Sequence, residues 1–239
     1  MSGSWKDSHH SVFSDATADV VLQSLEGTLY RVPSFVLRTT SGFFRTMLSL
    51  PQPADAKTTH EIPVGEHDGV MERVLRMMCG MEIPPWSSFD ELESALELME
   101  KWDTPGPLSF ARTALPGPMF AAEPLRVYLV ATRFGWQPET TAALLQTLQL
   151  DLLSGKHEEH LCKLSSRSLL QLVTFHDRCK TRFRASLDGT ELFSAGNQEP
   201  YECACGKRRD NYPWRALKNK IIAEYNRRPI GDHILVEMV

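Results

Sequence analysis

One histidine and three cysteines in the last third of this chain have the types and spacing of metal ligands. His176 and Cys179 are three residues apart, so on a helix they occupy one face on consecutive turns. Cys203 and Cys205 form a C-x-C pair that begins 24 residues after Cys179. Together they make a His-Cys₃ set, which suits structural zinc. A zinc ion held there would tie the C-terminal segment to the helix that carries His176.

The spacing of the C-x-C pair leaves two other interpretations open. Structural zinc sites usually space their cysteines as C-x₂₋₄-C, and two thiolates one residue apart strain a tetrahedral arrangement. In the first alternative, His176 and Cys179 are ordinary core residues, while Cys203 and Cys205 are free or mobile. In the second, the cysteines have a disulfide or redox role. Structural zinc is the one cofactor that the sequence suggests.

The patterns of common catalytic sites do not occur in the sequence. It contains no G-x-S-x-G elbow, no P-loop and no G-x-G-x-x-G. A dyad of Cys179 and His176 is conceivable, but a reactive thiolate needs a positively charged, partly open setting. The neighbouring Arg178, Lys180 and Arg182 point away from the stripe that carries the dyad. We therefore expect no enzymatic activity and no catalytic residue.

Helices of the C-terminal half must position these ligands. Apolar residues at every third or fourth position predict a long helix over 165–187. Shorter helices are predicted over 124–134 and 138–153, each opened by a proline. A polar link over 189–201 then leads to the C-x-C pair, and a final amphipathic helix should run from Trp214 to about Arg228.

Basic residues crowd the last part of the chain. They outnumber Glu202, Asp210 and Glu224, although the whole chain has a net charge of −4. A basic amphipathic helix can bind nucleic acid, acidic lipid or an acidic protein face, or pack within the molecule on the acidic helix face between Asp90 and Glu100. The negative charge of the whole chain argues against nucleic acid as a partner. The basic residues are Lys207, Arg208, Arg209, Arg215, Lys218, Lys220, Arg227 and Arg228.

The composition is that of an ordinary globular protein. Of 239 residues, 42% are hydrophobic and 23% are charged, and this length favours one domain with an extension or two small domains. No apolar run approaches the roughly 20 residues that span a bilayer, so we expect no membrane association. Residues 1–15 are polar and should form a flexible lead-in, without the apolar core of a secretory signal. The five cysteines are sparse, which favours reduced thiols in the cytoplasm or nucleus.

A β-hairpin is indicated near the start of the chain. Two short apolar runs, over 19–24 and 28–32, flank a Glu26-Gly27 turn. Such a hairpin is marginally stable alone, so the two short helices that follow must cover it. Those helices supply Phe43, Phe44, Met47 and Leu48.

More elements follow the hairpin and its helices. A third strand is predicted over 60–64, where Pro63 suggests an edge position. A helix is predicted over 68–79. The next helix should begin at Ser88, which forms an S-x-x-E capping box with Glu91.

The hairpin and the paired helices together resemble the opening of the BTB/POZ domain, a protein–protein interaction module. The family pattern reads D-V-x-[LF], a second strand, and then H-x-x-V-L-x-x-x-S-x-x-F. Pro33 stands where the family has the histidine. The stretch FRTMLSLPQ, from Phe44 to Gln52, is similar to the short fungal members of the family. The matching positions are Asp19, Val20, Val36, Leu37, Ser41 and Phe44.

The resemblance implies an α+β fold, in which a small mixed β-sheet flanked by helices precedes an all-helical extension. We expect a flexible segment over 1–15 and a BTB/POZ-like domain over 16–122. A helical extension should cover 123–188, and a C-terminal segment with the C-x-C pair and the basic helix should cover 189–239.

The resemblance also implies a function in docking, through self-association or recruitment of a protein partner. If the family's homodimer holds, the surface would include Val20, Leu22, Phe35 and Leu37. A cullin-type ligase scaffold is a partner of some members, but the loop over 51–59 lacks their apolar-x-Glu motif. The alternative function is a zinc-stabilised nucleic-acid or chromatin-associated factor, which would use the basic C-terminal region and dimerise through the BTB/POZ part.

Overall fold

The structure is a computed structural model that describes residues 9–50, 61–189 and 201–230 apart from Cys203, together with Phe193 and Asn197. The chain has an α+β fold, as the sequence predicts. It divides into two compact units, Met1–Phe120 and Ala121–Val239. The division falls beside Ala122, the last residue of the predicted BTB/POZ-like domain. The second unit contains both the helical extension and the C-terminal segment.

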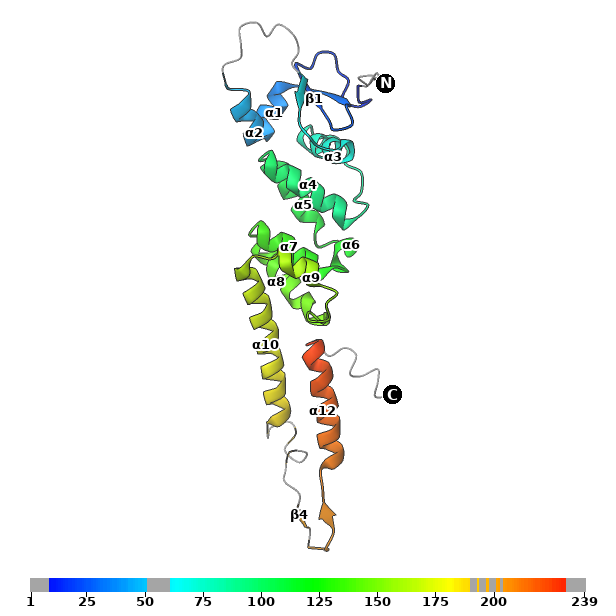
Figure 1. Cartoon of the computed structure of the whole chain (residues 1–239), viewed down its shortest axis with the longest axis vertical. Helices are drawn as coiled ribbons and strands as arrows, with labels where there is room; N and C mark the ends of the chain where they lie inside the picture. The colour runs from blue at the N-terminus through cyan, green and yellow to red at the C-terminus, as the bar shows by residue number, and fades with distance from the viewer. Residues whose placement is uncertain are drawn as a thin grey trace, which may run out of the picture. The chain divides into compact units, whose positions relative to one another are not determined.

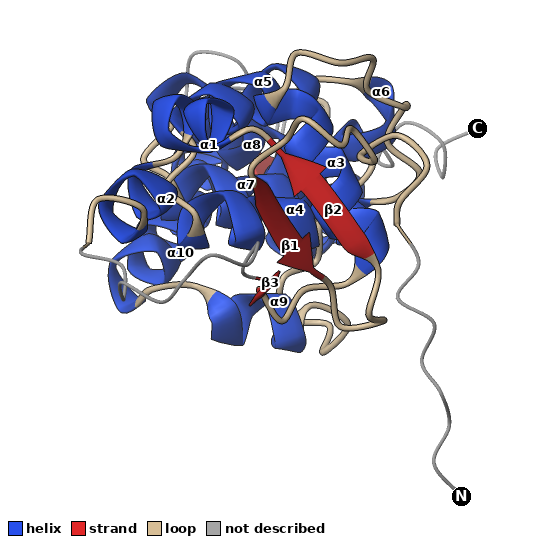
Figure 2. Cartoon of the chain, turned by 90° about the horizontal axis from the view of Figure 1, so that it is seen from above, coloured by secondary structure: helices blue, strands red, loops and turns tan. Residues whose placement is uncertain are grey.

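The first unit contains a three-stranded mixed sheet in the order β2-β1-β3. Strands β1 (Val20–Gln23) and β2 (Leu29–Val32) are antiparallel, with Val20 opposite Val32 and Gln23 opposite Leu29. Gly27 makes the turn between them at a φ of 84°, which glycine adopts without strain. Strand β3 (Glu61–Pro63) runs parallel to β1 at the other edge, so the edge position expected from Pro63 is confirmed. Figure 2 shows the strands as red arrows.

Helices cover the sheet of the first unit and supply most of its core. The core is made of large side chains without solvent contact, among them Leu22, Tyr30, Leu37, Phe44 and Trp102. The helices, visible in Figure 1, are α1 (Ser34–Thr40), α2 (Gly42–Met47), α3 (Asp68–Met78), α4 (Phe89–Lys101), α5 (Pro105–Ala114) and α6 (Pro118–Ala121).

The start of α4 differs in one detail from the predicted capping box. Ser88 caps the helix as expected, since its hydroxyl accepts a hydrogen bond from the Glu91 amide at 3.1 Å. The Glu91 carboxylate, however, accepts from the amide and hydroxyl of Ser87, both at 2.8 Å, instead of from the amide of Ser88. Arg73 of α3 explains the shift, because its guanidinium donates to the same carboxylate at 2.7 Å.

Part of the predicted flexible lead-in is packed on the sheet. The His10 amide donates to the Leu29 carbonyl at 2.9 Å, and the Arg31 amide donates to the Phe13 carbonyl at 2.8 Å. Phe13 is buried. Residues 9–13 therefore line the outer edge of β2, which the polar composition of this segment did not reveal.

The second unit is helical apart from a two-stranded hairpin. The predicted helix over 138–153 is shorter than expected, because α8 ends at Gln146 and passes into a short 3₁₀ turn. The elements are α7 (Pro124–Arg133), α8 (Gln137–Gln146), η1 (Thr147–Gln149), α9 (Glu158–Lys163), α10 (Ser166–Asp188), β4 (Tyr201–Glu202), β5 (Arg208–Arg209) and α12 (Tyr212–Arg227).

Helices α10 and α12 lie side by side and antiparallel (Figure 1). The rings of Phe183 and Tyr225 stack between them with centroids 3.8 Å apart, and Asp188 pairs with Lys218 further along. Helix α12 has no fully buried residue. The pair is thus held by partly exposed apolar contacts and by ion pairs. Neither of these helices, nor any other in the described part of the chain, is both long and apolar enough to cross a membrane.

Candidate interaction surfaces

The first residue of the family pattern, Asp19, fixes the start of α1. Helix α1 follows Pro33, which offers no side-chain cap. The Asp19 carboxylate fills this role, because it accepts hydrogen bonds from the Ser34 hydroxyl at 2.5 Å and from the Ser34 amide at 2.7 Å. These bonds stabilise the ionised form and lower the pKa of Asp19. The start of α1 is therefore tied to the start of β1.

The serine of the pattern fixes the other end of α1. The buried Ser41 hydroxyl accepts from the Phe44 amide at 3.1 Å, which caps α2, and donates to the Trp102 carbonyl at 2.5 Å. The Gly42 amide donates to the Asp103 carbonyl at 2.9 Å. The pattern residue Phe44 packs edge-on against the Trp102 ring at 5.1 Å. These contacts join the α1–α2 corner to the C-terminal end of α4.

Only one residue of the predicted interaction surface is at the surface. Val20, Leu22 and Leu37 are buried in the core of the first unit. They cannot contact a partner unless the sheet or α1 opens. Their burial therefore does not support the prediction that they belong to the interaction surface. Phe35, in contrast, is 76% exposed.

Phe35 lies on the outward face of α1. Arg38 and Thr39 follow it by three and four positions, so all three share one side of the helix, and all three are exposed. The Arg38 guanidinium donates to the Leu48 carbonyl at 3.3 Å, which links this face to the end of α2. An aromatic ring with adjacent polar groups, on a helix fixed at both ends, is typical of an interface anchor.

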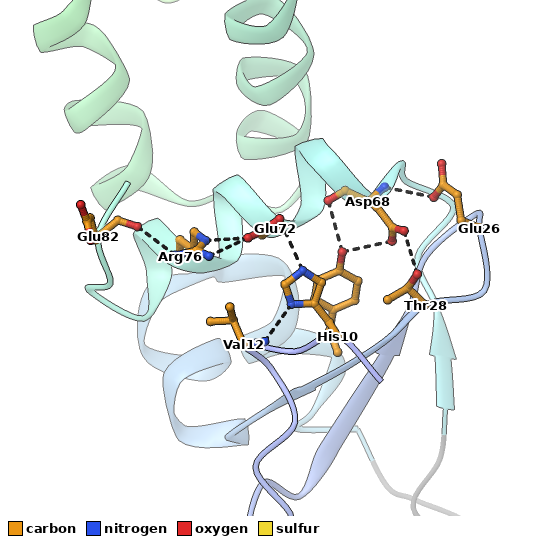
Figure 3. Close-up of polar contacts among 9 residues, drawn as sticks. His10, Val12, Glu26, Thr28, Asp68, Glu72, Arg76 and Glu82 are labelled. Carbon is orange, nitrogen blue, oxygen red and sulfur yellow. Dashed lines mark hydrogen bonds and ion pairs between the residues drawn. The ribbon is translucent and has the colours of Figure 1, made fainter. Parts of the chain in front are cut away.

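A polar network attaches the hairpin to α3 (Figure 3). Asp68, the first residue of α3, accepts from the Thr28 hydroxyl at 2.7 Å and from the Tyr30 hydroxyl at 3.0 Å. Glu26, in the hairpin turn, accepts from the Asp68 amide at 3.0 Å and contacts His67 Nδ1 at 2.7 Å. Burial opposes the charge on Asp68, but its hydrogen bonds outweigh burial and lower its pKa. The hairpin turn thereby caps a helix that has no side-chain cap of its own.

His10 extends this network to the N-terminal segment (Figure 3). Its ring stacks on Tyr30 with centroids 4.6 Å apart. Its Nδ1 accepts from the Val12 amide at 3.3 Å, and its Nε2 lies 3.4 Å from a Glu72 carboxylate oxygen. The sequence predicts a solvated histidine in a polar lead-in, because nothing in the local pattern connects His10 with Tyr30 or Glu72.

The structure gives His176 a place in the core of the second unit. Its Nε2 lies 3.0 Å from the hydroxyl of Thr147, and that hydroxyl donates to the Leu144 carbonyl at 2.6 Å. Because the Thr147 hydroxyl donates its only hydrogen to the Leu144 carbonyl, the protonated Nε2 of His176 donates the hydrogen bond to the Thr147 oxygen. Burial, together with the charge of Lys180, lowers the pKa of His176 to about 4. A metal could therefore reach only the Nδ1 atom of this ring without breaking the hydrogen bond.

The other predicted ligands are not gathered around His176. Cys179 is a free, partly exposed thiol one turn away, whereas Cys205 is disulfide-bonded in the β4–β5 hairpin and Cys203 lies outside the described residues. Cys179 precedes the end of α10 by nine residues, or about 13 Å of helix, and the hairpin lies beyond that end (Figure 1). Within the described ranges, no group of three or more His, Cys, Asp or Glu could hold a metal ion.

A small apolar hollow opens beside α9. Its volume is about 300 Å³, and Leu152, Leu153, Leu161 and Leu169 form most of the lining. Cys162 and Glu158 also line it. One thiol and one carboxylate among leucines suit an apolar side chain better than acid–base chemistry.

No family model matches the sequence, and no curated protein matches it either. The loop over 51–59, which lacks the cullin-binding motif, lies outside the described residues. The BTB/POZ resemblance therefore stays a prediction from the sequence pattern.

Proposed function

We propose that the first unit is a non-catalytic protein–protein interaction module of BTB/POZ type, and that it self-associates through the outward face of α1. The observation that carries this proposal is the 76% exposure of Phe35. Burying an aromatic ring of this size contributes about 2 kcal/mol. A helix held by Asp19 at one end and by Ser41 at the other presents this ring without a large cost in conformational entropy.

A second copy of the chain is the partner that this face fits best. A two-fold axis brings the same patch of both copies together, so that each Phe35 would pack on the partner's α1. Arg38 and Thr39 would then form a polar rim that excludes water from the two rings. Recruitment of a different protein would use the same helix face, with an apolar pocket for Phe35.

The test is the molar mass of the full chain in solution. Light scattering after size exclusion, over a range of concentrations, should give a dimer for the natural sequence and a monomer for Phe35→Ser. The matched control is Phe110→Ser on α5, where the ring is 47% exposed, and it should remain dimeric. A natural sequence that stays monomeric at high concentration would overturn the proposal, as would loss of the dimer in both variants.

Two further expectations from the sequence stay proposals. We place the protein in the cytoplasm or nucleus, a proposal supported by the free thiols of Cys79, Cys162 and Cys179. The disulfide-bonded Cys205 departs from the predicted reduced thiols and does not support this proposal. The second candidate function, a nucleic-acid or chromatin-associated factor, has one observation in its favour, which is the charge distribution on α10 and α12. Its zinc component has weaker support, because His176 Nε2 is already bonded to Thr147.

A further inference from the structure

Positive charge is concentrated in the helix pair and the segment that joins its two helices. Residues 166–230, here called the basic arm, contain 13 Lys and Arg against 7 Asp and Glu. Residues 1–165 contain 13 Lys and Arg against 21 Asp and Glu. The net charge of the whole chain therefore conceals two regions of opposite sign, and the sequence-based argument against nucleic acid does not apply to the arm alone.

Among the side chains that the structure describes, most cations of the basic arm form no ion pair. Arg215, Lys218, Arg227 and Arg228 form ion pairs with acidic residues of the second unit. Seven other cations are exposed, and in the described part of the chain no ion pair involves them. These seven are Arg167, Arg178, Arg182, Arg184, Lys207, Arg208 and Lys220.

Helical geometry sorts the charges of the arm into two flanks. The pairs Phe183–Tyr225 and Asp188–Lys218 set the register of α10 against α12. At 3.6 residues per turn, Arg178, Arg182 and Lys220 then lie along one flank, here called the phosphate flank. Arg182 follows Arg178 by about 6 Å along the helix axis, and Lys220 follows Arg182 by about 6 to 9 Å.

The opposite flank carries the acidic residues of α10. Asp177 and Asp188 fall there by the same geometry, and the contact between Asp188 and Lys218 agrees with this placement. Lys180, Arg184 and Arg215 share that flank. Since its cations are mixed with carboxylates, its local potential is weaker than that of the phosphate flank.

The tip of the arm adds an aromatic ring to the positive charge. Lys207 and Arg208 lie in or beside β5, and Tyr212, the first residue of α12, is 69% exposed. A base can stack on an exposed ring whatever its sequence, whereas an acidic peptide gains nothing comparable from it. Arginine also matches the phosphate group with paired hydrogen bonds.

We propose that the basic arm binds single-stranded nucleic acid, with the phosphodiester backbone along Arg178, Arg182 and Lys220 and with a base on Tyr212. This activity is independent of self-association through Phe35, so either can fail without the other.

The experiment measures the binding of labelled 20-nucleotide RNA and DNA by fluorescence anisotropy, with the full chain, between 50 and 200 mM salt. Each phosphate contact on a single strand contributes about −0.7 to the slope of log K against log salt. The variant Arg178→Gln/Arg182→Gln/Lys220→Gln should bind at least tenfold more weakly and have a slope about two units shallower.

The matched control removes the same charge from the opposite flank. Lys180→Gln/Arg184→Gln/Arg215→Gln should change the affinity less than threefold, with a nearly unchanged slope. Tyr212→Ala should weaken binding about tenfold, because one stacked base is lost. Circular dichroism should be the same for all three variants, since the replaced side chains are mostly exposed.

Other results would overturn the proposal. Equal losses in the two triple variants would mean that only net charge matters. Polyglutamate binding as tightly as the oligonucleotides, with Tyr212→Ala neutral, would mean that the arm takes an acidic polypeptide. Tighter binding of duplex than of single strands would exclude the single-stranded partner.

Discussion

At the scale of single residues, His176 should make the stability of the second unit depend on pH. Its folded-state pKa of about 4 is below the usual value of 6.5. Between these values the unfolded chain takes up a proton that the folded protein does not, so stability is full above pH 6.5 and falls as the pH drops towards 4. The loss should reach about 3 kcal/mol, at about 1.4 kcal/mol for each unit of pKa.

The measurement is urea unfolding at several pH values between 7.5 and 4.5, for the natural sequence and for His176→Gln. The variant should be less stable at pH 7.5 but should lose less stability on acidification. Carboxylates with lowered pKa, such as Asp19 and Asp68, titrate at lower pH in both proteins and cancel in the difference. If the free energy of unfolding of the two proteins had the same pH dependence, the assignment of a buried neutral imidazole to His176 would be contradicted.

Arg73 is a second residue whose environment predicts a measurable effect. Its buried guanidinium donates to Glu91 at 2.7 Å, to the Pro84 carbonyl at 2.6 Å and to the Pro85 carbonyl at 3.2 Å. It also lies 4.4 Å from the centroid of the Trp86 ring. Arg73→Met should destabilise the first unit by about 3 kcal/mol, because it leaves the two carbonyls without their guanidinium donor and the Glu91 carboxylate, still bonded to Ser87, without its cationic partner.

Chemical denaturation followed by circular dichroism checks this prediction. Arg73→Lys should lose somewhat less stability than Arg73→Met, since it keeps the charge but not the planar set of donors. The exposed Arg45→Met serves as control and should change stability by no more than about 0.5 kcal/mol. A loss for Arg73→Met as small as that of the control would mean that the guanidinium contributes nothing to the attachment of α3.

At the scale of secondary-structure elements, the corner between α1 and α2 depends on one hydroxyl. Ser41 caps α2 and also donates to the Trp102 carbonyl while it is fully buried. Ser41→Ala should therefore cost about 2 kcal/mol, the sum of a lost cap and a lost hydrogen bond to the Trp102 carbonyl, which would keep only the 3.3 Å bond from the Phe43 amide. Ser88→Ala, which removes an exposed cap of α4, should cost about 1 kcal/mol or less in the same unfolding measurement. Equal losses would show that the bond to Trp102 adds no stability.

The same elements show what could be predicted from the sequence and what could not. Alternation of side chains and the Glu-Gly turn were enough to predict the hairpin, and Pro63 was enough to predict the edge position of β3. Both predictions succeeded because the signals are local in the sequence. The partners of Asp19, Glu26 and Ser41 were not predictable, since each contact joins residues that are far apart in the chain. The pattern match identified Asp19 and Ser41 as important without giving the physical reason, which is helix capping from a distance.

The candidate sites were predicted less well than the elements, for a similar reason. Helical spacing correctly predicted that His176 and Cys179 share one face of a helix. It could not predict that the His176 imidazole would be hydrogen-bonded to Thr147. Exposure of Phe35 could not be derived from its type, because phenylalanine is usually buried. On the basic arm, the number of charges can be counted from the residue types, whereas the two flanks depend on the register between α10 and α12.

At the scale of the whole molecule, the division into two units predicts that the two proposed activities can be separated. The boundary follows Phe120, whose buried ring packs on Phe89 with centroids 5.2 Å apart. A fragment of residues 1–122 keeps this contact, so it should fold and self-associate as the full chain does. A fragment that ends at residue 116 loses the Phe120 ring and should be less stable by about 3 kcal/mol.

Both fragments can be followed by thermal unfolding and light scattering, and binding of the 20-nucleotide RNA provides a second readout. Neither fragment contains the basic arm, so neither should bind RNA, although 1–122 should still give a dimer that Phe35→Ser abolishes. RNA binding by 1–122 would place the nucleic-acid surface in the wrong unit. Because the first 165 residues are net negative, the full chain should bind RNA more weakly at low salt than a fragment of residues 121–239, and the difference should shrink as salt screens the repulsion.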